Sequence, residues 1–203
     1  MRRGLTSKGH TSKSSIGIEE PVVRELPAAR ILTGGFWHQC SPSRRLLDVV
    51  DPAVTFGRYH QSGGPGVWYA SSTETGAWAE LFRHHEPGGI SPFEVRRLIG
   101  KVQAADLKVL DLTKQGVRKH FGVSVKDLTA DDLTRCQDIA ERARAAGYDG
   151  ILAPSAALET QRTLAVFASS LHRLIEEESR VARAPTRMRR VSNRVRVKTR
   201  MRR

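Results

Sequence analysis

The chain has 203 residues, of which 39% are hydrophobic and 27% are charged, and its formal net charge is +13. This length suits one ordinary domain, or one smaller domain with tails, and provides enough apolar residues for a core. Two cysteines, Cys40 and Cys136, are too few for a disulfide framework or a zinc site. No stretch approaches the roughly 18 apolar residues that a membrane span needs, and no signal-peptide run follows the basic start. The composition therefore predicts a cytoplasmic protein without a metal site.

The excess positive charge lies at the two ends of the chain. Residues 179–203 contain eleven Arg or Lys and no acid, and residues 1–17 contain four and no acid. The composition predicts a disordered basic N-terminal segment and a disordered basic tail. Such a tail can contact nucleic acid or acidic partners electrostatically, or it can be a solvated extension. The folded domain is therefore expected over residues 18–178.

Within this domain, strand-like and helix-like segments intermix without a strict βαβ rhythm, which predicts the α+β class. The expected elements, in chain order, are a turn and short strand over 32–40, a strand over 67–70, a helix after residue 71 that ends at 87–89, strands over 93–102 and 107–112, a helix over 130–146, strands over 150–153 and 163–168, and a helical segment over 171–178.

The first of these helices is predicted in most detail. Ser71 and Glu74 have the spacing of a capping box, in which each side chain bonds the other residue's backbone N–H. Trp78 and the phenylalanine four residues later lie on one face, which is expected to pack inward. Glu80 and His84 are also four apart and are expected on another face of the same helix. The helix can therefore bury its aromatic rings while presenting a carboxylate and an imidazole elsewhere.

Three chemically distinct side chains lie at an even spacing of eleven residues: Arg58, Tyr69 and Glu80. A guanidinium suits a phosphate, an aromatic ring suits a flat heterocycle, and a carboxylate suits a ribose or a developing cation. Together they suggest a nucleotide pocket. Each residue also has an ordinary structural alternative, namely a surface ion pair for the arginine, a core position for the tyrosine and an exposed helix face for the glutamate.

The same region resembles a known family. The motifs are Gly57-Arg58-Tyr59, Trp68 to Ser72 and Ala77 to Glu80, and further matches follow in order at 109–113, 136–137 and 150–156. These motifs resemble the RES domain, and the likeness extends from about Gly34 to Phe167.

The resemblance implies the toxin component of a bacterial toxin–antitoxin pair, with a single domain similar to the ADP-ribosyltransferase toxins and a small mixed sheet flanked by helices. It implies that NAD⁺ is a substrate, not a cofactor, and that the nicotinamide–ribose bond is cleaved by phosphorolysis, with inorganic phosphate as co-substrate, or by hydrolysis. Transfer of ADP-ribose to a protein is the alternative activity. The implied partner is an antitoxin with a helix-turn-helix DNA-binding part, and a homo-oligomer within the toxin–antitoxin complex is plausible by family.

By position, the resemblance identifies Arg58 and Glu80 as the family arginine and glutamate, Ser155 as the serine, and Tyr69 as the aromatic residue before the glutamate helix. Arg58, Tyr69 and Glu80 are the expected catalytic residues, and Arg58 and Tyr69 also bind substrate. Ser155 is expected to hydrogen-bond the ligand and not to act as a nucleophile, because no G-x-S-x-G elbow surrounds it. His84, one turn after Glu80, is expected to face the same pocket. The chain also has no P-loop and no G-x-G-x-x-G motif, which fits NAD⁺ as a substrate in a cleft.

One departure from the family pattern concerns the phosphate site. Many members have an additional arginine about twenty residues before Arg58, and this chain has Trp37 and His38 there. His38 is expected to contact phosphate in its place, although a neutral imidazole binds phosphate less firmly than a guanidinium does. Two alternatives therefore remain open, an inactive RES-like interaction module and a nucleic-acid-binding protein that uses its basic ends.

Overall fold

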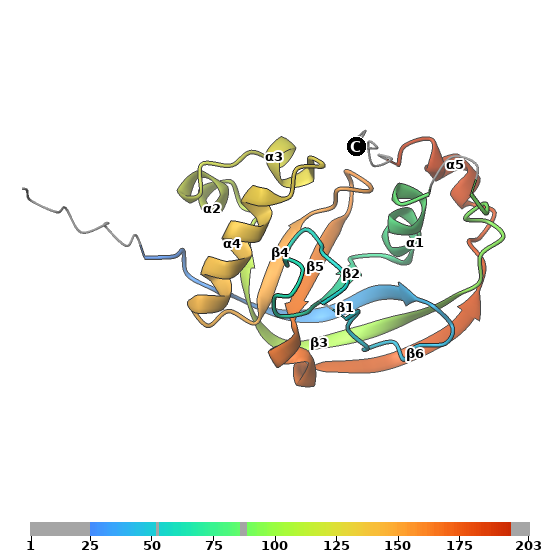
Figure 1. Cartoon of the computed structure of the whole chain (residues 1–203), viewed down its shortest axis with the longest axis horizontal. Helices are drawn as coiled ribbons and strands as arrows, with labels where there is room; N and C mark the ends of the chain where they lie inside the picture. Colours follow the sequence, from blue (N-terminus) through green and yellow to red (C-terminus); the bar gives the residue numbers. More distant parts are fainter. Residues whose placement is uncertain (1–24, 52, 86–88, 196–203) are drawn as a thin grey trace, which may run out of the picture.

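The computed structural model describes residues 25–51, 53–85 and 89–195. It contains one mixed six-stranded sheet with helices packed at both ends (Figure 1). The elements are β1 Arg30–Cys40, β2 Val67–Ser71, α1 Glu74–Arg83, β3 Arg97–Asp111, α2 Gln115–His120, α3 Val125–Thr129, α4 Thr134–Ala145, β4 Gly150–Pro154, β5 Arg162–Phe167, the 3₁₀ helix η1 Ala168–Arg173, β6 Leu174–Ala182 and α5 Met188–Ser192. The predicted α+β class is confirmed, whereas the N-terminal segment 1–17 lies outside the described residues.

Five of the six strands close into a barrel. The strand order is β1-β2-β5-β4-β3-β6, and β1 also pairs with β3, which joins the two ends of the first five strands. Only β3 and β4 run parallel, and all the other pairs are antiparallel. The ladder between β1 and β2 has a single pair of residues, Trp37 with Ser71, so the barrel has few backbone hydrogen bonds at this point. This seam lies beside α1, where side chains from several elements meet.

Strand β3 organises the sheet. Two strands separated near residue 105 were expected, and the structure has one strand of 15 residues. Its partner β1 follows it from Arg30, opposite Val109, to Cys40, opposite Leu98, and this long antiparallel ladder keeps the backbone extended. On its other edge, β3 pairs with β4 near its end and with β6 near its start. One strand therefore supports both the barrel and the C-terminal part of the chain.

The helices differ from the prediction at their starts. Helix α1 is capped by Thr73, whose side chain accepts a hydrogen bond from the Gly76 N–H at 3.1 Å, because Ser71 is still part of β2. Helix α4 begins at Thr134 and not near 130, and α2 and α3 were not predicted. Gly147 ends α4 with a positive φ of 74°, as expected of a C-terminal glycine.

The C-terminal part of the chain is the largest correction. Residues 171–178 were expected to be helical, and they form the end of η1 and most of β6. The expected disordered tail from residue 179 is wrong as far as residue 195, because β6 continues to Ala182 and α5 follows. Met188 is fully buried and Val195 is 8% exposed, and both belong to the cluster that packs against α1. Residues 196–203 lie outside the described residues.

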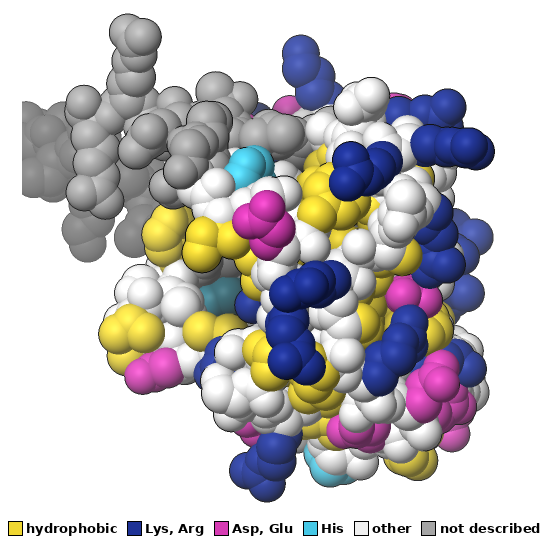
Figure 2. Space-filling model, turned by 90° about the vertical axis from the view of Figure 1, so that its right-hand side faces the viewer, with side chains coloured by type: hydrophobic (Ala, Val, Ile, Leu, Met, Phe, Trp, Pro, Cys, Tyr) yellow, Lys and Arg dark blue, Asp and Glu magenta, His cyan; other side chains and the backbone are white. Residues whose placement is uncertain are grey.

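Some basic residues of the C-terminal segment make contacts within the fold. Figure 2 views the side of the molecule where α5 lies, and Lys and Arg side chains are scattered over this surface. Two of them, Arg180 and Arg187, form ion pairs with Glu74 of α1 at 2.8 and 3.0 Å. A third, Arg189, lies over the Phe93 ring at 5.1 Å from its centroid. The C-terminal segment therefore braces α1 as well as adding positive charge.

Because β4 and β5 pack closely at Gly150, one added methyl group there is expected to lower the stability of the fold strongly. A Cβ added at Gly150 would lie 2.2 Å from the Ala165 carbonyl oxygen, a backbone atom that cannot move without disrupting the ladder. We expect Gly150→Ala to lower the free energy of unfolding by about 3 kcal/mol in urea titrations. Gly116→Ala is the matched control, because nothing lies within 4 Å of its added Cβ and alanine favours the helix. Equal stability of the two variants would contradict this packing argument.

Candidate functional site

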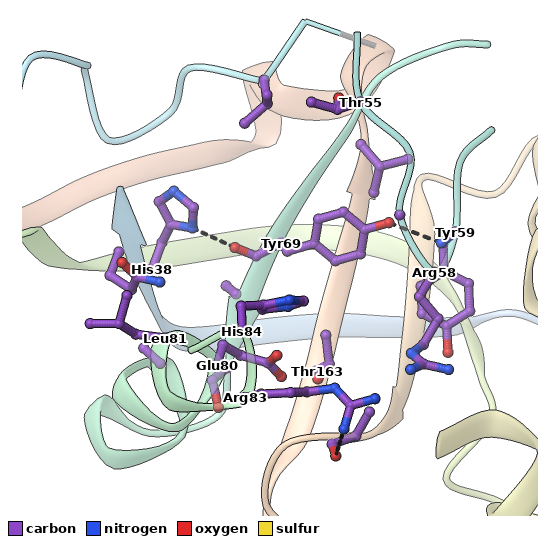
Figure 3. A pocket seen from close by; sticks show the side chains of 18 of the residues that line it. His38, Thr55, Arg58, Tyr59, Tyr69, Glu80, Leu81, Arg83, His84 and Thr163 are labelled. Atoms are coloured by element: carbon purple, nitrogen blue, oxygen red, sulfur yellow. Dashed lines mark hydrogen bonds between the residues drawn. The ribbon is translucent and has the colours of Figure 1, made fainter. Parts of the chain in front are cut away.

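The predicted site residues surround one cavity of about 650 Å³. Its walls come from β1, β2, α1, the starts of β3 and β5, the segment that precedes β2, and the segments that precede α4 and follow β4. His38, Arg58, Tyr69, Glu80 and His84 all line it, so residues from four parts of the chain meet here (Figure 3). Of the six predicted site residues, Ser155 does not line the cavity itself and lies behind Glu80.

Arg58 is fixed by backbone carbonyls and not by an acid. One terminal nitrogen, Nη1, donates to the carbonyl oxygens of Leu128 and Ala130, both at 2.9 Å. The turn around Arg58 is held in addition by Gln137, whose side-chain amide donates to the carbonyls of Gly57 and His60. Because Nη1 is anchored in this way, the remainder of the guanidinium is available to the cavity that Arg58 lines.

Tyr69 is held by hydrogen bonds at its hydroxyl. The oxygen accepts from the Tyr59 backbone N–H at 2.9 Å and lies 3.0 Å from Nδ1 of His60. Burial raises the pKa of Tyr69 well above its usual range, so the phenol stays protonated at neutral pH. The ring spans the cavity in Figure 3, with Arg58 beyond its hydroxyl end. Tyr69 therefore offers a rigid aromatic surface and not a phenolate nucleophile. Its neighbour Trp68 is 2% exposed and belongs to the core, as expected.

Glu80 extends from α1 toward the cavity, with Ser155 behind it. Burial raises the pKa of Glu80 above its ordinary value, against the opposing influence of Arg83, Arg58 and the Ser155 hydroxyl. The Ser155 oxygen accepts from the backbone N–H groups of Ala157 and Leu158, which occupies its two lone pairs. Its proton is therefore directed at the Glu80 carboxylate, 3.4 Å away. The predicted contact between Ser155 and a ligand is not what this geometry favours, because the serine orients the glutamate.

Three charged residues that line the cavity were not predicted, namely Arg83, Asp131 and Arg97. Arg83 is 4% exposed and forms an ion pair with Asp131 at 2.5 Å, and it also donates to the Ala156 carbonyl at 3.1 Å. The spacing of three residues between Glu80 and Arg83 on one helix was a signal that Arg83 lies close enough to influence the carboxylate. Asp131 reaches the cavity from the segment before α4. The pair holds the α1 side of the cavity against the opposite wall.

His38 does not have the geometry of a phosphate ligand. Its Nδ1 lies 2.6 Å from the Tyr69 carbonyl oxygen, and since a carbonyl only accepts, Nδ1 carries the proton. Burial, with the positive charges of Arg97 and Arg44, lowers the pKa of His38 to about 4. At neutral pH the imidazole is uncharged and its Nε2 has no proton to donate. His38 therefore joins β1 to β2 at the seam of the barrel.

The low pKa of His38 predicts a dependence of stability on pH. Between pH 6.5 and about 5 the unfolded chain protonates this histidine while the folded chain does not, so acid favours the unfolded state. We expect this linkage to cost about 2 kcal/mol over that interval. His38→Asn, in which the amide keeps a donor for Tyr69, should lose this part of the slope in urea unfolding at pH 5 and 6.5. An unchanged difference between the two pH values in the variant would contradict the assignment.

The described residues impose two further limits. Over residues 25–195 with the gaps given above, no group of three or more His, Cys, Asp or Glu is placed to hold a metal ion. No helix in that part of the chain is long and apolar enough to span a bilayer.

Comparisons with known proteins show the family of this chain. Residues 28–188 match the family model of the RES domain. A Mycobacterium tuberculosis protein named "Probable NAD(+) phosphorylase Rv3189" is 50% identical over 159 residues, which are 78% of this chain and 76% of that protein. Among solved structures, a chain in the crystal structure of the M. tuberculosis MbcT-MbcA toxin-antitoxin complex has a similar fold, with a TM-score of 0.68 and 20% identity over 83% of this chain and 92% of that one.

Proposed function

Because this chain belongs to the RES domain family, we propose that it consumes NAD⁺ by phosphorolysis of the nicotinamide–ribose bond and acts as the toxin of a toxin–antitoxin pair. The observation that carries the proposal is the meeting of Arg58, Tyr69 and Glu80 at one cavity in a chain half identical to a protein named as an NAD⁺ phosphorylase. A cavity of about 650 Å³ is also within the range that holds a dinucleotide-sized ligand.

In this proposal, the bond between the nicotinamide nitrogen and C1″ of its ribose breaks, and the electron pair of that bond leaves with nicotinamide. A phosphate oxygen forms the new bond to C1″, which gives ADP-ribose 1″-phosphate and neutral nicotinamide. Positive charge develops on the sugar in the transition state, and the Glu80 carboxylate stabilises it. Arg58 binds a phosphate of the dinucleotide through the part of its guanidinium that its carbonyl contacts leave available.

Tyr69 and Ser155 have supporting roles in this reaction. The Tyr69 ring packs against a flat part of the substrate, because its hydroxyl is already bound to the Tyr59 N–H. Ser155 holds the Glu80 carboxylate in position from behind. His84, at the exposed C-terminal end of α1, lies at the mouth of the cavity, where it contacts the part of the substrate nearest to solvent.

An assay with separated products tests this function. Purified protein, freed from any partner, is incubated with NAD⁺ with and without inorganic phosphate, and the products are resolved by chromatography and mass spectrometry. Phosphorolysis gives ADP-ribose 1″-phosphate only when phosphate is present, and hydrolysis gives ADP-ribose in both conditions. ADP-ribose found on protein would support the alternative transfer activity. Constant NAD⁺ in every condition would exclude phosphorolysis and hydrolysis, and a test of the transfer reaction would then need labelled NAD⁺ and a target protein.

We also propose a neutralising antitoxin as partner, since an unrestrained NAD⁺ consumer would kill its own cell. The mouth of the cavity offers an apolar surface, because Val50 and Phe56 both line the cavity and are 46% and 64% exposed. Co-expression with a cognate antitoxin is expected to restore both growth and cellular NAD⁺. Restored growth with depleted NAD⁺ would show that the antitoxin does not act at this site.

A further inference from the structure

Besides Arg58, the cavity is lined by Arg97, a second arginine with which no acid among the described residues forms an ion pair. Its charged lining residues are three arginines and two acids: Arg58, Arg83, Arg97, Glu80 and Asp131. The ion pair between Arg83 and Asp131 accounts for one charge of each sign. Glu80 can balance one of the two remaining arginines, so the lining keeps an excess positive charge even when its three histidines, His38, His60 and His84, are neutral. Such a cavity suits ligands with more than one negative charge.

Arg97 is the third arginine that lines the cavity. It is the first residue of β3, next to the end of β1, and its Nε donates to the Gln39 side-chain oxygen at 2.5 Å. Within the described residues, neither of its terminal nitrogens donates to a protein acceptor, and no carboxylate forms an ion pair with it. Burial lowers the pKa of Arg97. A half-buried guanidinium without a counter-ion costs free energy in the empty protein and is stabilised when an anion binds.

The contact with Gln39 also orients the guanidinium. Because Nε donates to the amide oxygen of Gln39, the edge of the Arg97 guanidinium formed by its two terminal nitrogens remains available. This edge can donate two parallel hydrogen bonds to the oxygens of one phosphate, a geometry that lysine cannot reproduce. Gln39 and Arg97 both line the cavity, so the edge lies where a ligand in the cavity can reach it.

We propose that Arg97, held by Gln39, is a phosphate-binding residue of this cavity and takes the role that the sequence suggested for His38. The two residues are close, since the positive charge of Arg97 acts on the His38 imidazole. His38 has no proton to offer from Nε2 and Arg97 has a complete donor edge, so the arginine is the better phosphate ligand of the two. The phosphate belongs either to the pyrophosphate of NAD⁺ or to the inorganic co-substrate.

The identity of the ligand in this inference rests on the proposed function, and binding measurements test the role of Arg97 separately from that function. Wild type, Arg97→Gln and Arg97→Lys are titrated calorimetrically with ADP and with inorganic phosphate, as full-length protein. We expect Arg97→Gln to weaken binding of one of the two probes about 30-fold, and Arg97→Lys to weaken it less, because lysine keeps the charge but loses the fork. Arg96→Gln is the matched control, because Arg96 is the preceding residue, is exposed and does not line the cavity.

The probe that is affected identifies the source of the phosphate. Loss of ADP binding assigns Arg97 to the dinucleotide, and a raised KM for NAD⁺ should accompany it. Loss of inorganic phosphate binding assigns it to the co-substrate, with a raised KM for phosphate instead. Unchanged binding of both probes by Arg97→Gln, equal losses in Arg96→Gln, or no binding by wild type would overturn the inference. If wild type binds ADP or phosphate through Arg97 but leaves NAD⁺ intact, only the proposed function fails.

Discussion

Glu80→Gln is expected to reduce the kcat for NAD⁺ consumption by about 10³-fold while the KM for NAD⁺ changes little. Glutamine keeps the size of the side chain and can still accept the Ser155 hydrogen bond, so the variant removes charge and little else. A group that stabilises charge developing only in the transition state affects kcat more than substrate binding. Because burial raises the pKa of Glu80, wild-type activity should also fall with acid at a pH above the ordinary 4.5 of a glutamate.

The matched control for this experiment is Glu94→Gln, the same chemical change at an exposed position outside the cavity. Initial rates over a range of NAD⁺ concentrations separate kcat from KM for both variants, and thermal unfolding checks that each is folded. A Glu80→Gln protein with the wild-type kcat would remove the carboxylate from the mechanism. A loss confined to KM would assign Glu80 to substrate binding alone.

Arg58→Lys is expected to lower kcat/KM for NAD⁺ by about 10²-fold, mainly through a higher KM. The arginine contacts two carbonyls with one nitrogen and keeps the rest of its guanidinium for the cavity. Lysine has a single nitrogen at the end of its chain. It can either stay with the carbonyls of Leu128 and Ala130 or reach the substrate, but its geometry does not allow both. Retention of positive charge alone should therefore not restore binding.

Arg45→Lys is a suitable comparison for this variant, because the Arg45 side chain is 92% exposed and lies outside the cavity. Steady-state kinetics on both variants, together with their melting temperatures, distinguish a lost substrate contact from a displaced loop. Wild-type KM in Arg58→Lys would show that charge without a fork is sufficient. A lower melting temperature with normal kinetics would assign Arg58 to holding the segment before α4.

The elements around Glu80 were predictable because local signals are strong there. The short apolar strand over 67–70 and the aromatic face of the following helix both have the expected position, with Trp78 fully buried. The even spacing of Arg58, Tyr69 and Glu80 is not itself a structural period, since the three lie on a loop, a strand and a helix. They meet because α1 follows β2 immediately and folds back over the edge of the barrel.

The remaining elements and site residues were not predictable, because their positions depend on contacts between residues far apart in the sequence. Strand β6 has seven exposed residues in succession and lies at an edge of the sheet, so it has no alternation for the sequence to reveal. The position of Arg97 depends on the pairing of β1 with β3, and that of Asp131 on its ion pair with Arg83 of α1. The role of His38 could not be foreseen either, because the atom that it contacts is a backbone carbonyl of β2.

The bracing of α1 by the C-terminal segment bears on how the protein can be shortened. A basic terminus is a common target for trimming before purification, and composition alone would place the cut near residue 179. That cut removes Arg180 and Arg187 from Glu74, and it removes Met188 from the cluster beneath the helix that carries Glu80. Cleavage or truncation there would therefore inactivate the enzyme without removing any residue that lines its cavity.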